Sequence, residues 1–168
     1  MKIPFKHIKK HLVDEPSLKD ISNSLYQLGH EHEIVGDVFD IEITPNRGDC
    51  LSLLGICRDI GAFYKTKLDL KYFSNKIKKL NFQFKNESPD ACPKISFLKI
   101  EIDEVNNNYQ DYLEDYFKDL GNKKNNFFTD ISNYLSYEIG QPTHCYDYEK
   151  INNKEITFGI NNKNFEFK

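Results

Sequence analysis

The sequence predicts an α+β protein, in which a small helix-rich module at the N-terminus precedes a second module of helices and strands. Apolar residues recur at helical spacing in several segments, and the spacing changes to an alternation of two between residues 30 and 44. A lysine-rich, weakly periodic stretch separates the two halves. We therefore expect a helix-rich module with a β-hairpin at 1–64, a connector at 65–88 and an α+β module at 89–168.

The first module is expected to begin with two short helices. Phe5, Ile8 and Leu12 recur at helical spacing after a proline. Ser17 is suited to cap a second helix, and Gly29 is suited to end it. The apolar face of this second helix carries Leu18, Ile21, Leu25 and Leu28.

A β-hairpin and a third helix are expected to complete this module. Alternating apolar and polar residues predict the hairpin at 30–44, with Gly36-Asp37 as its tight turn. A dense turn cluster follows at 44–49, where Asp49 is suited to cap the next helix. That helix carries an apolar stripe made of Leu53, Ile56, Cys57, Ile60 and Tyr64.

The second half predicts both strands and helices. Strand character is expected at Phe82 and Phe84 in the connector, and a strand is expected across 97–102. Helices are predicted at 109–120 and 131–139, because each has helical apolar spacing and a glycine directly after it.

A final hairpin is predicted from residues 156–160 and 164–167, which flank Asn161-Asn162. The chain ends inside the second of these strands. We therefore expect the 89–168 module to be incomplete relative to its natural domain.

Composition excludes several classes of protein. The formal net charge of -3 and pI near 6.0 exclude nucleic-acid binding through a broad basic field. No apolar run approaches the length of a membrane span, so no membrane partner is expected. The charged start lacks the apolar core of a signal peptide, and the four cysteines are expected to be free thiols in a cytoplasmic protein.

Metal and thiol chemistry receive little support. His30 and His32 form an H-x-H pair of the kind that some metal sites use, but no third ligand is placed by sequence, so a solvated strand face is favoured. The cysteines form no C-x-x-C pair. Cys145 follows His144 directly, whereas a nucleophile and its base normally meet across a fold. We predict no resident metal and no cofactor-binding residue in this chain.

Two polar clusters stand out. In the turn at 44–50, Arg47 fits a salt bridge, a subunit contact or a phosphate ligand, and the structural role is favoured. In the second cluster, Asn133 and Glu138 are expected on the polar side of a short helix. Gly140 ends that helix, and His144 is expected on the following loop, where binding residues often lie. Taken alone, such a histidine is more often structural.

These clusters carry a family resemblance. The segment 40–64, DIEITPNRGDCLSLLGICRDIGAFY, resembles the T-P-N-R-x-D-C-L-S region of the bacterial phenylalanyl-tRNA synthetase β-subunit family. The segment 125–151, NNFFTDISNYLSYEIGQPTHCYDYEKI, is similar to the family's V-D-x-T-N-Y and E-x-G-Q-P-x-H-x-F-D block. The start of the chain resembles the family's N-terminus as well.

The resemblance implies a structural module followed by the beginning of an editing module, which hydrolyses tyrosine wrongly attached to phenylalanine tRNA. It implies that His144 and Asn133 line the editing pocket, that Ser132 contributes a hydroxyl, and that Gln141 and Glu138 support the loop. It also implies an α2β2 assembly in which the α subunit uses ATP and magnesium for synthesis. The isolated chain is therefore expected to be inactive.

Three departures from the family pattern limit this resemblance. Gly36-Asp37 joins segments between which typical β subunits insert an oligonucleotide-binding domain. Ser132 replaces a threonine, and the run 92–95 replaces a C-P-R-Y motif. A rival interpretation is a non-enzymatic, β-subunit-like interaction or nucleic-acid adaptor module. The reading frame beyond codon 168 distinguishes the two, because only a fragment would continue into further β-subunit motifs.

Overall fold

The computed structural model describes residues 1–69, 76–105 and 108–160, and it confirms the α+β class. The chain divides into two compact units, each built from two stretches of sequence. The first unit comprises Met1–Phe73 and Val105–Cys145, and the second comprises Ser74–Glu104 and Tyr146–Lys168.

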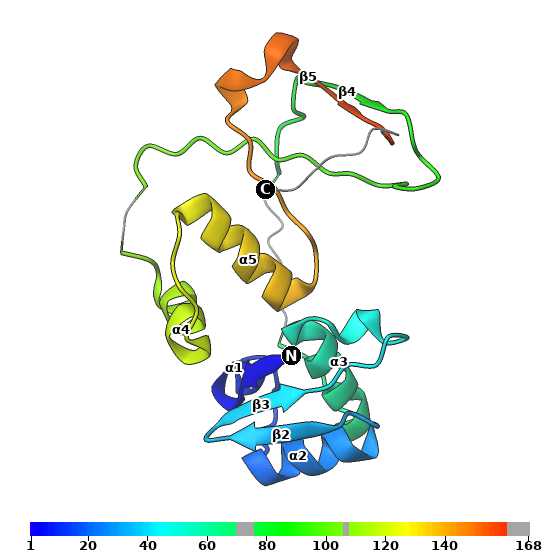
Figure 1. Cartoon of the computed structure of the whole chain (residues 1–168), viewed down its shortest axis with the longest axis vertical. Helices are drawn as coiled ribbons and strands as arrows, with labels where there is room; N and C mark the ends of the chain where they lie inside the picture. The colour runs from blue at the N-terminus through cyan, green and yellow to red at the C-terminus, as the bar shows by residue number, and fades with distance from the viewer. Residues whose placement is uncertain (70–75, 106–107, 161–168) are drawn as a thin grey trace. The chain divides into compact units, whose positions relative to one another are not determined.

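A three-stranded antiparallel sheet forms one layer of the first unit (Figure 1). Strand β3 (Val38–Ile41) lies in the middle, between β1 (Lys2–Pro4) and β2 (His32–Val35). The predicted hairpin is confirmed as β2 and β3, and Gly36 in their turn has a φ of 66°. Pairing with β1 ties the very start of the chain to the hairpin, a contact that the sequence pattern did not predict.

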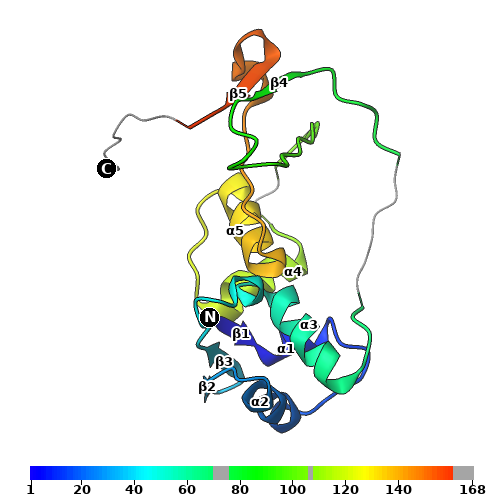
Figure 2. The same ribbon diagram turned by 90° about the vertical axis from the view of Figure 1, so that its right-hand side faces the viewer.

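The two predicted N-terminal helices are confirmed as α1 (Phe5–Lys9) and α2 (Leu18–Gln27). In α2, the Ser17 side chain accepts from the backbone of Asp20, and the Asp20 carboxylate accepts from the backbone of Ser17, which closes a capping box. The helix lies alongside the hairpin in both views (Figure 1, Figure 2). Its residues Ile21 and Leu25 are fully buried in the core of this unit.

Helix α3 (Leu53–Tyr64) follows a short 3-10 turn, η1 (Gly48–Cys50). The expectation that Asp49 caps this helix is wrong: Ser52 is the N-cap, and its hydroxyl accepts a 3.0 Å hydrogen bond from the backbone of Gly55. Asp49 lies inside the 3-10 turn, before the N-cap position of the helix. The carboxylate of Asp49 instead binds the two arginines of the chain.

Helices α4 (Asp111–Leu120) and α5 (Phe127–Ile139) also belong to the first unit, and both were predicted. Each ends at a left-handed glycine, Gly121 at φ 64° and Gly140 at φ 72°. The small core between these helices includes Leu113, Tyr116 and Phe117. Tyr137 of α5 packs against this core and also against the larger core of the sheet and N-terminal helices.

A buried hydrogen-bonded chain ties α4 and α5 to the N-terminal elements. The His7 ring of α1 lies 2.9 Å from the Asp119 carboxylate through Nε2 and 2.8 Å from the Tyr137 hydroxyl through Nδ1. Burial lowers the pKa of His7 in spite of the nearby carboxylate. A neutral imidazole that donates from Nε2 and accepts at Nδ1 satisfies both partners.

These contacts explain why the structural division differs from the sequence-based one. Residues 108–145 pack with the N-terminal elements, whereas the sequence pattern places them in the 89–168 module. The boundary was drawn at a change of composition, and composition does not report which surfaces pack together. The boundaries at 64 and 88 stay a prediction.

The second unit contains a two-stranded parallel sheet of β4 (Gln83–Asn86) and β5 (Glu155–Phe158). Two 3-10 turns, η2 (Tyr148–Lys150) and η3 (Asn152–Lys154), precede β5. Phe84 lies in β4 as expected, and Phe82 lies just before it.

The predicted strand across 97–102 is wrong, because these residues are irregular in the structure. The ring of Phe97 packs against the rings of Phe82 and Phe84. This apolar residue is therefore accounted for by an aromatic cluster and not by pairing in a β-sheet. The predicted final hairpin is only partly testable. Its first strand corresponds to β5, which pairs with β4, and residues 164–167 lie outside the described residues.

Within the described part of the chain, none of the helices has both the length and the apolar character needed to cross a bilayer.

Gly55→Ala is expected to destabilise the first unit. A Cβ at this position would lie 2.1 Å from the backbone oxygen of Asp49, so η1 or α3 would have to move. We expect a loss of about 1–3 kcal/mol, which exceeds the gain in helix propensity. Urea unfolding measures this loss. Gly48→Ala is the matched control, since a Cβ there meets nothing within 4 Å, and equal midpoints for the two variants would contradict the prediction.

Candidate functional site

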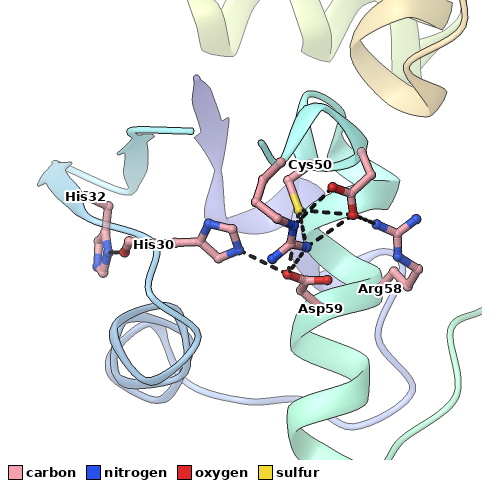
Figure 3. Close-up of polar contacts among 7 residues, drawn as sticks. His30, His32, Cys50, Arg58 and Asp59 are labelled. Carbon is pink, nitrogen blue, oxygen red and sulfur yellow. Dashed lines mark hydrogen bonds and ion pairs between the residues drawn. The ribbon is translucent and has the colours of Figure 1, made fainter. Parts of the chain in front are cut away.

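Both arginines of the chain lie in one ion cluster between the turn η1 and the middle of α3 (Figure 3). Arg47 donates to the Asp49 carboxylate through Nε at 3.0 Å and through Nη2 at 3.1 Å. Its Nη2 also donates to Asp59 Oδ2 at 2.6 Å, and Arg58 donates to Asp49 from the other side. The structural role that the sequence favoured for Arg47 is confirmed.

His30 and Cys50 complete this cluster from neighbouring elements. His30 lies before β2, and its Nε2 is 3.1 Å from Asp59 Oδ2. The Cys50 sulfur accepts from Arg47 Nη2 at 2.8 Å. The cluster therefore joins the end of the α2 segment, the turn η1 and the middle of α3.

The electrostatics of the cluster favour charged carboxylates and a neutral thiol. The hydrogen bonds from Arg47 lower the pKa of the Asp49 carboxyl to about 2. Burial acts to raise the pKa of Asp59, but hydrogen bonds from Arg47 and His30 outweigh it, and the net pKa is lowered. Burial, aided by the charge of Asp59, raises the pKa of the Cys50 thiol to about 11. At neutral pH this thiol is protonated.

Three atoms of this cluster satisfy the spacing of a metal site. The ligand atoms of His30, Cys50 and Asp59 all lie within 4.8 Å of one another. However, the Arg47 guanidinium contacts both the Cys50 sulfur and the Asp59 oxygen, so a cation already occupies the position where an ion would bind. The residues therefore do not fit a metal ion while Arg47 is in place.

The H-x-H pair is not brought together by the fold. Figure 3 shows the His30 ring directed toward Asp59 and the His32 ring directed elsewhere. His32 Nδ1 donates to the His30 carbonyl at 3.0 Å, and its Nε2 lies 2.8 Å from the Ser22 hydroxyl. Both rings are buried, so the solvated strand face that was favoured for them is wrong, although their role here is structural.

The predicted editing residues lie on α5 and on the loop that follows it. Ser132 is half-buried in the middle of the helix, Asn133 is exposed beside it, and His144 is exposed on the loop. The expectation that Asn133 lies on the polar side of a helix is confirmed. The sequence did not show how the loop and the helix are arranged relative to each other.

The loop turns back along α5 (Figure 2). At its start, the Ser136 hydroxyl donates to the Gln141 carbonyl at 3.4 Å. At its end, the Cys145 sulfur lies 3.8 Å from the Ser132 hydroxyl and 3.8 Å from the Phe128 carbonyl. The residue directly after His144 therefore contacts one of the predicted editing residues.

Glu138 has a structural contact. Its carboxylate accepts a 2.7 Å hydrogen bond from the Tyr134 hydroxyl one turn earlier in α5. Burial and this hydrogen bond raise the pKa of Tyr134. This hydrogen bond lies within α5 and does not reach the loop, so the loop-supporting role of Glu138 stays a prediction.

A hollow of about 490 Å³ lies between the turn before α3 and the end of α5. It is lined from both sequence clusters, by Asp49, Ser52 and Arg58 on one side and by Gly140 and Gln141 on the other. In the described part of the chain, none of the three predicted editing residues lines this hollow. The sequence did not show that the two clusters approach each other. The role of Ser52 could have been found from the sequence, because serine directly before a helix is a common N-cap.

Asp59→Asn is expected to destabilise the protein by about 1–3 kcal/mol, because the neutral amide loses the charge that pairs with the Arg47 guanidinium and accepts only weaker hydrogen bonds from Arg47 and His30. Its side chain is only 14% exposed, so water replaces few of these contacts. Chemical unfolding gives the value. Glu15→Gln is the matched control on a pair with an 83% exposed carboxylate, where a change within about 0.5 kcal/mol is expected. A similar loss in both variants would disprove a special role for Asp59.

The ion cluster also predicts acid sensitivity. A carboxyl with a lowered folded-state pKa stabilises the fold above its unfolded pKa, and this stabilisation is lost as the pH falls through the folded value. For Asp49 the range runs from its ordinary pKa of 3.8 down to about 2. Melting temperatures across this range should fall less steeply in Asp49→Asn than in the unmodified protein. Parallel curves would show that Asp49 is not linked to folding.

The chain is similar to known proteins over most of its length. Residues 91–168, which include α5 and the His144 loop, match the B3/4 domain family. A phenylalanine–tRNA ligase β subunit from Rickettsia bellii is 40% identical over 121 residues, covering 68% of this chain and 13% of that protein. The β subunit from Blochmanniella floridana is 30% identical over 152 residues, covering 89% of this chain and 19% of that protein.

A third relative, the β subunit from Rhodopirellula baltica, is 34% identical over 140 residues, covering 79% of this chain and 20% of that protein. The chain thus spans a fifth or less of the length of these relatives. The resemblance carried by the two motifs agrees with the domain match and with the names of the relatives. On these grounds the chain belongs to the family of phenylalanine–tRNA ligase β subunits.

Proposed function

We propose that the chain is the N-terminal portion of a phenylalanine–tRNA ligase β subunit and contributes part of the site that hydrolyses tyrosine wrongly attached to phenylalanine tRNA. The β subunit works in the cytoplasm in an α2β2 assembly with the α subunit. ATP and magnesium serve amino-acid activation by the whole enzyme. The match of residues 91–168 to the B3/4 domain family supports this assignment.

The geometry of the loop after α5 is the observation that carries the proposal. Because Cys145 contacts Ser132, the loop brings the neighbouring His144 back to the middle of α5, where Asn133 is exposed. The hydroxyl and the amide are neighbours on α5, and the loop thereby adds the imidazole of His144 to the same local surface. A hydroxyl, an amide and an imidazole provide both donors and acceptors of hydrogen bonds.

These groups are suited to ester hydrolysis by a bound water. The water oxygen attacks the carbonyl carbon of the mischarged ester, the bond to the tRNA ribose oxygen breaks, and that oxygen takes up a proton. His144 and Asn133 orient the water and the ester, and the Ser132 hydroxyl adds a hydrogen bond. Positioning and electrostatic stabilisation account for the rate, so a covalent nucleophile is not needed.

His144→Ala is expected to slow hydrolysis of tyrosyl-tRNA while phenylalanine charging stays nearly unchanged. The measurement uses the complete ligase that carries this sequence in its β subunit. A positioned group of this kind contributes about 10²-fold or more to the rate. If the variant lowers the melting temperature but hydrolyses the ester normally, His144 only packs the loop and the proposed role is wrong.

Asn133→Ala tests the same surface from the helix and should also slow hydrolysis. Asn23→Ala is the matched control, because Asn23 is likewise an exposed asparagine within a helix, α2. Melting temperatures for both variants separate lost helix stability from lost chemistry. Equal hydrolysis rates in the two variants would remove Asn133 from the site.

A further inference from the structure

We infer that Gly140 is a positioning residue for the proposed editing site, and that it acts through its close contact with Ser52. The inference rests on the proposed function of the His144 loop. It links the two sequence clusters, because Ser52 caps α3 directly after the arginine turn and Gly140 ends α5 directly before the loop.

The contact leaves little room for a side chain at position 140, so Ser52 or the loop would have to give by a few tenths of an ångström. A Cβ built on Gly140 would lie 3.1 Å from Ser52 Cβ, 3.3 Å from Ser52 Oγ and 3.8 Å from the Leu51 carbonyl oxygen. Gly140 also has a φ of 72°, a conformation that residues with a Cβ adopt at a cost. Space and backbone conformation are therefore two separate requirements for glycine here.

Ser52 provides a firm surface for this contact. Its hydroxyl holds the backbone of Gly55 in the first turn of α3, and the side chain is buried. The turn before it is held by the pairing of Asp49 with Arg47 and Arg58. A shift of Ser52 away from a new side chain would therefore disturb both the helix cap and the ion cluster.

The end of α5 has little freedom to move in the other direction. Tyr137, one turn before the end, packs against both apolar cores, and its hydroxyl bonds to His7. The loop directly after Gly140 is tied to α5 by longer contacts, from Ser136 to Gln141 at 3.4 Å and from Ser132 to Cys145 at 3.8 Å. A side chain at position 140 would consequently displace the loop that carries His144.

Gly140→Ala in the complete ligase is the first test. We expect the kcat for tyrosyl-tRNA hydrolysis to fall by about 10²-fold, because a small misplacement of a positioned group has an effect of this size. Phenylalanine charging should be unchanged. Gly140→Asn is the second variant, since asparagine tolerates the left-handed conformation while it still carries a Cβ, and it should show the same defect.

Gly121→Ala is the matched control. Gly121 ends α4 at a φ of 64°, but a Cβ there meets nothing within 4 Å. This variant has the same kind of backbone strain without the contact, so it should lower the melting temperature and leave hydrolysis intact. Equal loss of hydrolysis in Gly121→Ala and Gly140→Ala would overturn the inference.

Rescue by a change at Ser52 is the decisive readout, because a general loss of stability would not produce it. Ser52→Gly removes both side-chain atoms that a Cβ at position 140 would meet, and glycine is an acceptable N-cap. Combined with Gly140→Asn, it should restore most of the lost hydrolysis. Failure of this rescue would overturn the inference.

The inference and the proposed function can fail separately. If His144→Ala abolishes hydrolysis while Gly140→Ala and Gly140→Asn leave kcat unchanged, the proposed function stands and the positioning role is wrong. If His144→Ala leaves hydrolysis unchanged, the proposed function of the loop is itself wrong, whatever the glycine variants do.

Discussion

The hydrogen-bonded chain from Asp119 through His7 to Tyr137 is the constraint on which the first unit depends. It joins α1 to both later helices, although these partners lie more than a hundred residues apart in sequence. Burial keeps the imidazole neutral, and a neutral ring has one donor and one acceptor, which match the carboxylate and the hydroxyl. Because α5 is held in this way, the loop after it starts from a defined position.

The ion cluster between η1 and the middle of α3 defines the other side of the same region. Arg47 and Arg58 are the only arginines in the chain, and both bind carboxylates of their own fold. Arginine suits this purpose because its planar guanidinium holds several acceptors at once. The turn at 44–50, which resembles a family motif, therefore has a structural role, and the residues after it contact the end of α5.

The proposed editing groups divide between rigid and loop positions. Ser132 and Asn133 lie on a regular helix, whose orientation depends on two apolar cores and the His7 contacts. His144 lies on a loop, which contacts α5 through Gln141 and Cys145. A loop residue needs such supports because loops make fewer buried contacts than helices. We therefore expect distant substitutions to shift the position of His144 more than the positions of Ser132 and Asn133.

The sequence by itself determined the local elements. Helical spacing and terminal glycines predicted α4 and α5, Ser17 predicted the cap of α2, and Gly36 predicted the hairpin turn, because each depends on neighbouring residues alone. Two motifs were also sufficient to suggest the family. The tertiary structure alone decided that 97–102 forms no strand, that 108–145 packs with the N-terminal elements, and that Gly140 meets Ser52. These outcomes depend on contacts between distant segments, and spacing along the chain does not specify which surfaces meet.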